Sequence, residues 1–92
     1  MKQYRSRITP NFLSLYRALP AETRARARRA YRRWRENPDL PGLRFKRVWA
    51  DGRIYSVRID ARHRAVGEML GDEITWDFIG DHEAYARYLA GL

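Results

Sequence analysis

The spacing of the apolar residues changes at Pro41-Gly42, and this change constrains the fold more than any other feature of the sequence. Before it, apolar residues recur every three or four positions, which is typical of helices that bury one face. After it, they alternate with polar residues, which is typical of strands in a half-buried sheet. The 92 residues limit the chain to one domain, residues 1–92. We therefore expect a single α+β domain.

Two helices are predicted before the change. Thr9-Pro10 is typical of a helix start, because a hydroxyl caps the first turn and proline fits the first helical position. The first helix then carries, at helical spacing, Phe12, Leu15, Tyr16 and Leu19. The second helix is predicted from Ala21 to Arg35, and Asn37-Pro38 ends it. Its apolar stripe consists of Ala27, Ala30, Tyr31 and Trp34. We expect these helices to form a hairpin with facing apolar stripes.

Strands are predicted on both sides of the helices. A short alternating segment at 4–8 precedes them. The later alternation predicts four strands, in the ranges 43–49, 54–59, 63–70 and 74–78. Asp51-Gly52 and Gly71-Asp72 are typical hairpin turns. Gly80 ends the last strand, and Asp81 can cap a final helix. The predicted order is β-α-α-β-β-β-β-α: an N-terminal helical hairpin packed on a curved antiparallel sheet of about four strands, then a C-terminal helix.

Several classes of protein are disfavoured by composition. The absence of cysteine excludes a disulfide scaffold, a thiolate zinc site and a cysteine nucleophile. The two histidines are far apart in sequence, so we expect no metal and no cofactor. No run of about 18 apolar residues could span a membrane, and no leader for secretion is recognisable. We expect a cytoplasmic protein.

Positive charge dominates the composition. The chain carries 19 Lys and Arg against 11 Asp and Glu, for a formal net charge of +8. The only lysines are Lys2 and Lys46, and the other Lys-plus-Arg positions are all arginine. Such charge attracts phosphate backbones whatever their sequence, and arginine can hold a phosphate through two N–H groups. The charge favours nucleic acid or an acidic protein as the partner, and a merely solvated arginine-rich surface is the alternative.

One face of the predicted sheet gathers basic side chains. The more apolar set in the strand at 54–59 is Tyr55, Val57 and Ile59. Ser56 and Arg58 therefore project to the other face. Lys46 and Arg64 of neighbouring strands can share that face, although the sequence leaves the register open. An anion between these cations would offset their repulsion, whereas a solvated charged face is the other interpretation.

His82 is a second candidate, because it falls in the first turn of the predicted last helix. Histidine, with an ordinary pKa of about 6.5, can accept or donate a proton at cellular pH. Tyr85 lies three residues on, on the same helical face. The structural alternatives are a surface residue for His82 and a core anchor for Tyr85. His63 lies nearer a turn, where a structural role or a secondary RNA contact is expected.

From Thr9 to Leu89 the chain resembles the RelE/ParE superfamily, the toxins of bacterial type II toxin–antitoxin systems. The resemblance rests on a helical hairpin ending in ENP, the basic strand LRFKRV and the strand YSVRI. It continues through RHRAV, an ITW…IG strand and the closing IGDHEAY, which is similar to the ending of HigB- and YafQ-like members. It implies a small α+β toxin that an antitoxin encoded beside it neutralises.

The resemblance also implies roles for particular residues. The ribonuclease branch cleaves mRNA in the ribosomal A site without a metal. By resemblance, Arg58 and Arg64 hold the scissile phosphate, His82 does acid/base work, and Tyr85 orients or protonates. Phosphate binding around these four catalytic residues is expected from Lys46, Arg44, Arg47 and His63. The attack of a 2′-hydroxyl on its own phosphorus needs a base, an acid and cations, which these residue types supply.

Two other functions stay open. The ParE branch poisons DNA gyrase as a binding inhibitor and would not need His82. A basic binding protein without catalysis is the third reading. The function that we expect is a metal-independent endoribonuclease acting on the ribosome. Its expected partners are mRNA, the ribosome and a cognate antitoxin with an acidic or partly disordered segment, and no membrane.

Overall fold

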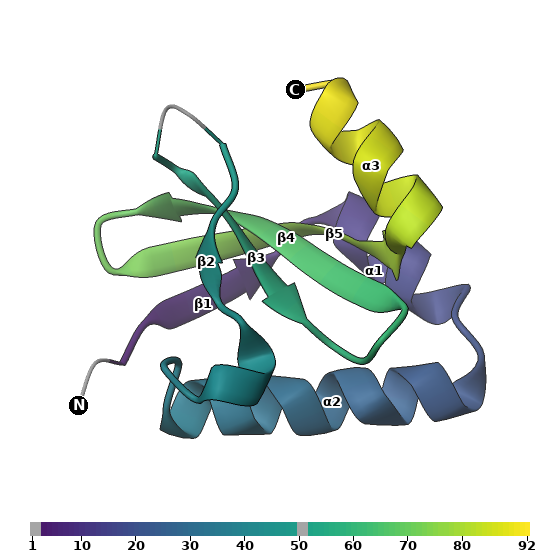
Figure 1. Cartoon of the computed structure of the whole chain (residues 1–92), viewed down its shortest axis with the longest axis horizontal. Coiled ribbons are helices and arrows are strands. Elements are labelled where there is room, and N and C mark those ends of the chain that lie inside the picture. Colours follow the sequence, from purple (N-terminus) through teal and green to yellow (C-terminus); the bar gives the residue numbers. More distant parts are fainter. Residues whose placement is uncertain (1–2, 50–51) are drawn as a thin grey trace.

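The computed structural model describes residues 3–49 and 52–92. Its elements follow the predicted order (Figure 1), with bounds β1 (Arg5–Ile8), α1 (Pro10–Arg17), α2 (Ala21–Glu36), η1 (a 3-10 turn, Pro41–Leu43), β2 (Lys46–Arg47), β3 (Ile54–Arg58), β4 (His63–Leu70), β5 (Glu73–Asp81) and α3 (His82–Ala90). The predicted α+β class is confirmed. Asp51 of the predicted Asp51-Gly52 turn lies outside the described residues. Gly52 has a φ of 81°, which glycine adopts without strain.

The strands form one sheet in the order β1-β5-β4-β3-β2. Strands β2 to β5 are antiparallel neighbours, as predicted. The N-terminal strand adds a fifth member, because β1 pairs in parallel with β5. The strand predicted at 43–49 is reduced to Lys46–Arg47. Leu43 belongs instead to η1, and Arg44 takes a left-handed φ of 46° that ends the turn.

Both predicted helix caps are confirmed. The Thr9 hydroxyl accepts a hydrogen bond from the Phe12 backbone N–H at 3.1 Å, and Pro10 opens α1. The Asp81 carboxylate accepts one from the Ala84 backbone N–H at 2.9 Å, which starts α3. These contacts satisfy backbone donors that have no partner inside the helix.

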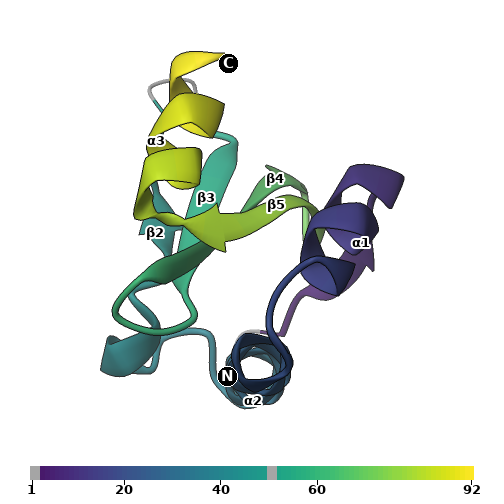
Figure 2. The same cartoon turned by 90° about the vertical axis from the view of Figure 1, so that its right-hand side faces the viewer.

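The hydrophobic core lies between α2 and one face of the sheet (Figure 2). Ala27, Ala30 and Trp34 of the predicted stripe are buried. The Trp34 ring stands edge-on to Trp76 at 5.4 Å between ring centroids, and edge-on to Phe45 at 5.6 Å. This aromatic packing joins the helix to the strands that follow it.

The two N-terminal helices lie on the same face of the sheet, and α1 packs against β5. Their apolar side chains face a groove of about 600 Å³ that the sheet closes from behind. Tyr31, the least buried member of the stripe, lines this groove. Across it, an Arg28 N–H donates to the Tyr16 hydroxyl at 2.7 Å. In the described part of the chain, no helix combines the length and the apolar character needed to cross a membrane.

The opposite face of the sheet carries α3 (Figures 1 and 2). The Tyr88 ring packs against Phe78, tilted by 31° with 4.8 Å between ring centroids, and Phe78 alternates with the core residue Ile79. Val66 pairs with Phe78 while Gly67 pairs with Trp76, so Asp77 is an extra residue in β5. A bulge of this kind re-aims a side chain. The Asp77 carboxylate thereby accepts hydrogen bonds from the hydroxyls of Thr9 at 2.7 Å and Tyr88 at 2.8 Å.

Candidate functional site

Two arginines lie directly opposite each other on the face that carries α3. The register pairs Arg58 of β3 with Arg64 of β4. Residues so paired share a face with their Cβ atoms about 4.5–5.5 Å apart, and like charges there repel. Lys46 pairs with Ser56 on the same face. The register that the sequence left open therefore gathers three of the expected cations on one surface.

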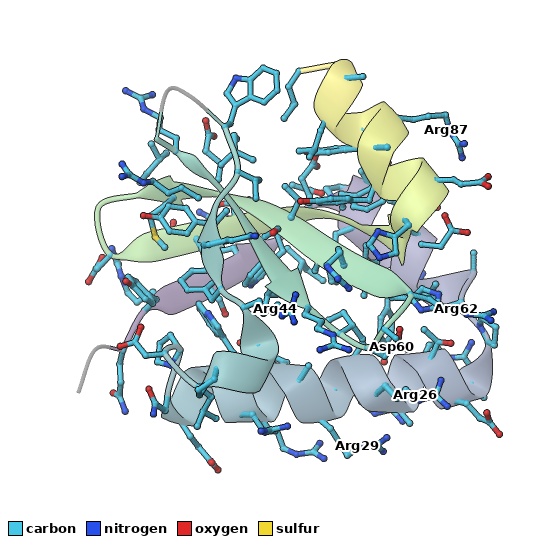
Figure 3. The ribbon with its side chains drawn as sticks, viewed as in Figure 1. Arg26, Arg29, Arg44, Asp60, Arg62 and Arg87 are labelled. Atoms are coloured by element: carbon cyan, nitrogen blue, oxygen red, sulfur yellow. The ribbon has the colours of Figure 1, made fainter. Side chains whose placement is uncertain are left out.

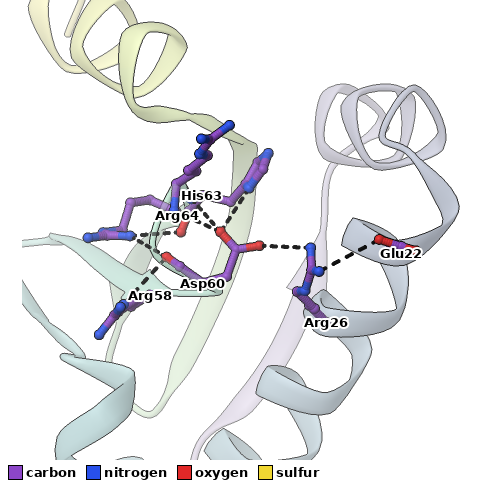
Figure 4. Close-up of polar contacts among 7 residues, drawn as sticks. Glu22, Arg26, Arg58, Asp60, His63 and Arg64 are labelled. Atoms are coloured by element: carbon purple, nitrogen blue, oxygen red, sulfur yellow. Dashed lines mark hydrogen bonds and ion pairs between the residues drawn. The ribbon is translucent and has the colours of Figure 1, made fainter.

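The backbone of the β3–β4 loop holds both guanidinium groups (Figure 4). Arg64 donates to the carbonyl oxygens of Asp60 at 2.8 Å and His63 at 3.0 Å. Arg58 donates to the same Asp60 carbonyl at 3.4 Å. Carbonyl oxygens orient a guanidinium without neutralising its charge. No Asp or Glu within residues 3–49 and 52–92 forms an ion pair with either arginine.

The charges of Arg58 and Arg64 therefore repel each other without a neutralising partner in the described residues. Burial lowers the pKa of Arg64 below its ordinary value, and the neighbouring charges of Arg58 and Arg44 lower it further. Tyr85 and Asp60 act in the other direction without reversing the shift. Two half-buried cations without a carboxylate between them favour the binding of an anion, such as a phosphate, that can accept hydrogen bonds from both.

Asp60 organises the loop that carries these carbonyls. Its carboxylate accepts the backbone N–H groups of Arg62 at 2.8 Å and His63 at 2.9 Å, and lies 2.9 Å from Nδ1 of the His63 ring. It also lies 3.6 Å from the guanidinium of Arg26 in α2. Burial opposes ionisation here, but these hydrogen bonds and the His63 charge hold the pKa of Asp60 below its ordinary value.

Sequence reasoning missed Asp60. The signal was present, because an aspartate between two alternating segments commonly accepts the N–H groups two and three residues on, as in DARH here. The sequence does not show that Asp60 joins β3 and β4, through its carbonyl oxygen, to α2, through its contact with Arg26.

The first turn of α3 begins beside the arginine pair. Arg64 pairs with Gly80, and the next pair along the strands is His63 with Asp81. A Cβ at Gly80 would lie 2.8 Å from the Phe78 ring and 3.3 Å from the Ala84 Cβ, so glycine lets the helix approach the sheet. The Asp81 carboxylate is occupied as the helix cap.

His82 and Tyr85 lie on this first turn. The His82 ring is edge-on to the Tyr85 ring with 6.5 Å between centroids, and His82 is exposed. Tyr85 is within electrostatic range of Arg64. Tyr85 thus contacts the His82 ring and interacts electrostatically with Arg64.

The remaining expected phosphate contacts divide between two places. Arg44 lies near Arg64, on the side of the molecule turned to the viewer in Figure 3, and Lys46 is exposed. Arg47 pairs with Tyr55 and so belongs to the other face of the sheet. The His63 ring is 17% exposed and is held by Asp60. The structure places Arg47 away from the arginine pair. His63 meets Arg64 through its carbonyl oxygen, while its ring is bound to Asp60.

Metal ligands do not gather in the described ranges, where no three His, Asp or Glu side chains are placed to hold an ion. The chemistry available to the site's own residues is that of fixed cations, one imidazole and one phenol. Such groups can bind an anion and transfer a proton beside it.

One family model matches more than half of the chain. The family model described as the ParE-like toxin domain matches residues 21–87. A comparison by sequence with curated proteins finds no match.

Several solved structures share the fold. RelE from a RelB–RelE antitoxin–toxin complex of Methanococcus jannaschii is 17% identical, with a TM-score of 0.67, covering 89% of this chain and 96% of that chain. A mutant of the Escherichia coli toxin RelE in the free state is 16% identical, with a TM-score of 0.70 and coverages of 95% and 92%. YafQ from E. coli is 10% identical, with a TM-score of 0.66 and coverages of 90% and 98%. At these identities the likeness shows the fold.

Proposed function

The chain belongs to the ParE-like toxin domains of the RelE/ParE superfamily, and we propose that it is the endoribonuclease toxin of a type II toxin–antitoxin pair, cleaving mRNA on the ribosome without a metal. The observation that carries this proposal is the pairing of Arg58 with Arg64 beside α3. Two guanidinium groups fixed by one carbonyl, with no carboxylate partner in the described ranges, suit a single phosphodiester.

The reaction follows from the residue types. The 2′-hydroxyl forms a bond to the adjacent phosphorus, and the bond from phosphorus to the 5′-oxygen breaks. A base takes the proton of the 2′-hydroxyl, an acid protonates the departing 5′-oxygen, and a cyclic phosphate is left. His82 serves as acid or base, and Tyr85 beside it orients the imidazole or donates a proton. Arg58, Arg64 and Lys46 stabilise the charge on the phosphorane.

The partner that we propose is a cognate antitoxin with an acidic or partly disordered segment. Complexes of RelE with RelB antitoxins are among the structures that share this fold. An acidic segment that folds on binding would complement the net charge of +8. Covering the arginine pair would exclude the RNA phosphate.

The direct experiment is primer extension on an mRNA, with and without ribosomes, for the wild type and His82→Ala. Cleavage should need ribosomes and fall by about 10²- to 10⁴-fold in the variant, because acid–base catalysis contributes about that much. Glu83→Ala is the matched control, since Glu83 is exposed in the same helical turn. The Tm of each variant shows whether the fold is intact.

Two results would overturn the proposal. Equal cleavage by the wild type and His82→Ala removes the role of His82. A wild-type protein that leaves mRNA intact but stops DNA replication before translation, when its synthesis is induced, belongs to the gyrase-directed branch instead.

A further inference from the structure

Helix α2 carries more positive charge than the proposed reaction uses. Its 16 residues include seven arginines, at positions 24, 26, 28, 29, 32, 33 and 35. The buried residues of the helix are Thr23, Ala27, Ala30 and Trp34. The surface that α2 turns away from the sheet is therefore arginine with almost no apolar side chain.

Some of these arginines are engaged within the helical half of the molecule. Arg24 donates to the carbonyl oxygen of Leu19. Arg28 bonds to the Tyr16 hydroxyl, and Arg35 lies over the Tyr31 ring at 5.9 Å. Arg29, Arg32 and Arg33 differ, because all three are exposed and none of their side chains has a hydrogen bond or ion pair with any residue that the structure describes.

Arg26, Arg29 and Arg33 form one stripe, because residues three and four apart on a helix are neighbours with Cβ atoms about 5–6 Å apart. We call these three residues the α2 stripe. Figure 3 shows Arg26 and Arg29 on α2 below Asp60, and Arg62 of the β3–β4 loop above Asp60.

The α2 stripe is continuous with the arginine pair through Asp60. One oxygen of the Asp60 carboxylate lies 3.6 Å from the Arg26 guanidinium, and the Asp60 carbonyl accepts from both Arg58 and Arg64 (Figure 4). The exposed Arg62 occupies the same loop. Arg26 is itself paired with two carboxylates, because its guanidinium lies 3.7 Å from Glu22 as well as 3.6 Å from Asp60. A chain of phosphates that starts at the arginine pair can therefore cross the loop past Asp60, whose charge Arg26 offsets, and reach the unpaired arginines of α2.

We propose that the α2 stripe binds the phosphates that neighbour the scissile one, so that the RNA strand passes from the arginine pair over the β3–β4 loop onto α2. This inference rests on the proposed function for the identity of the phosphate at the pair. A protein partner would need an apolar centre as well as charge, and the stripe has none. Arginines without apolar neighbours suit a phosphate backbone, which they contact whatever its sequence.

The test compares two double variants that remove the same charge. Arg29→Gln/Arg33→Gln removes two arginines of the stripe. Arg17→Gln/Arg87→Gln removes two exposed arginines from the ends of α1 and α3. The probe is a long single-stranded RNA, whose affinity for the protein is measured over a series of salt concentrations. Ribosome-dependent cleavage gives kcat and KM for the same proteins.

The stripe variant should lose about 1.4 from the slope of log affinity against log salt, because each phosphate contact on a single strand contributes about 0.7. Its KM should rise while kcat stays unchanged. The control variant should keep the wild-type slope and the wild-type KM.

An equal loss of slope in both variants would mean that only net charge matters, which overturns the proposal. So would a stripe variant that binds RNA like the wild type but loses affinity for polyglutamate, since that result assigns the stripe to an acidic protein. If the wild type binds RNA with the stripe-dependent slope and cleaves none, the proposed nuclease fails while the α2 stripe stands.

Discussion

The two faces of the sheet differ in what holds their side chains in place. The face under α2 is closed by aromatic and aliphatic packing around Trp34, which is 1% exposed. The face under α3 carries Arg58 and Arg64, and α3 itself has no fully buried residue. On that face, the Tyr88 ring packs against Phe78, and the polar side chains are positioned by hydrogen bonds to the Asp60 loop and to Asp77.

This difference separates stability from chemistry. Burial of apolar area is the main source of folding free energy, so substitutions under α2 should lower the free energy of unfolding. The cations under α3 repel each other and are kept in spite of that repulsion. Substitutions there should leave the fold intact and remove the activity, and the following experiments test that division.

The largest effect is expected from Trp34→Ala. Truncating a buried tryptophan costs about 3–5 kcal/mol, out of a total of about 5–15 kcal/mol for a domain. The free energy of unfolding in urea measures the loss. Tyr31→Ala is the control, because Tyr31 lies on the same helix but is 39% exposed. Equal losses for the two variants would contradict a core centred on the fully buried Trp34, because the half-exposed Tyr31 should cost less.

The next largest effect is expected from Arg58→Gln, which should lower activity and leave stability unchanged. Removing one charge that stabilises a transition state lowers kcat by about 10²- to 10³-fold. The free energy of unfolding should stay within about 0.5 kcal/mol of the wild type, as for most substitutions outside the core. Ribosome-dependent cleavage and urea unfolding of the same sample give both values. A strongly destabilised variant would show that the arginine pair belongs to the core.

Tyr88→Phe tests the attachment of α3. The variant keeps the ring that packs against Phe78 and loses the hydrogen bond to Asp77. Burial and this hydrogen bond raise the pKa of Tyr88, so its phenol stays a donor through the neutral range. We expect a loss of about 1 kcal/mol in the free energy of unfolding. Hydrogen exchange should rise mainly in α3, and a uniform rise over the whole chain would argue against a local role.

The smallest effect concerns pH and Asp60. Because the folded pKa of Asp60 is lowered, its carboxylate adds stability above the unfolded pKa of about 3.9, and that stability is lost as pH falls through the folded value. The difference in unfolding free energy between the wild type and Asp60→Asn should therefore be present at neutral pH and shrink in acid. A difference that stays constant with pH would show that the charge of Asp60 adds nothing.

Local sequence signals predicted the elements well. Thr9-Pro10, Asp81 and the two spacings of apolar residues each act within a few residues, and the structure bears them out. The strand predicted at 43–49 shortened because Leu43 finds a buried place in η1, which depends on contacts distant in sequence. The parallel pairing of β1 with β5 likewise depends on contacts between residues distant in sequence.

The sequence predicted which residues belong to the candidate site, but not how they are arranged. Alternation places Arg58 on the face opposite Val57, but its pairing with Arg64 depends on register, which the loop between β3 and β4 decides. The contact from Arg26 to Asp60 joins a helix to a loop 34 positions later, and no local pattern encodes it.

The parallel strand β1 has a consequence for how the molecule assembles. Arg5 meets Asp72 across a sequence separation of 67 residues, so one edge of the sheet stays open until β5 exists. Contacts this distant raise the contact order, and the entropy lost in closing such a loop slows folding. On a nascent chain, β1 has no strand to join until about four-fifths of the sequence has been translated. We therefore expect this edge to be completed late in folding.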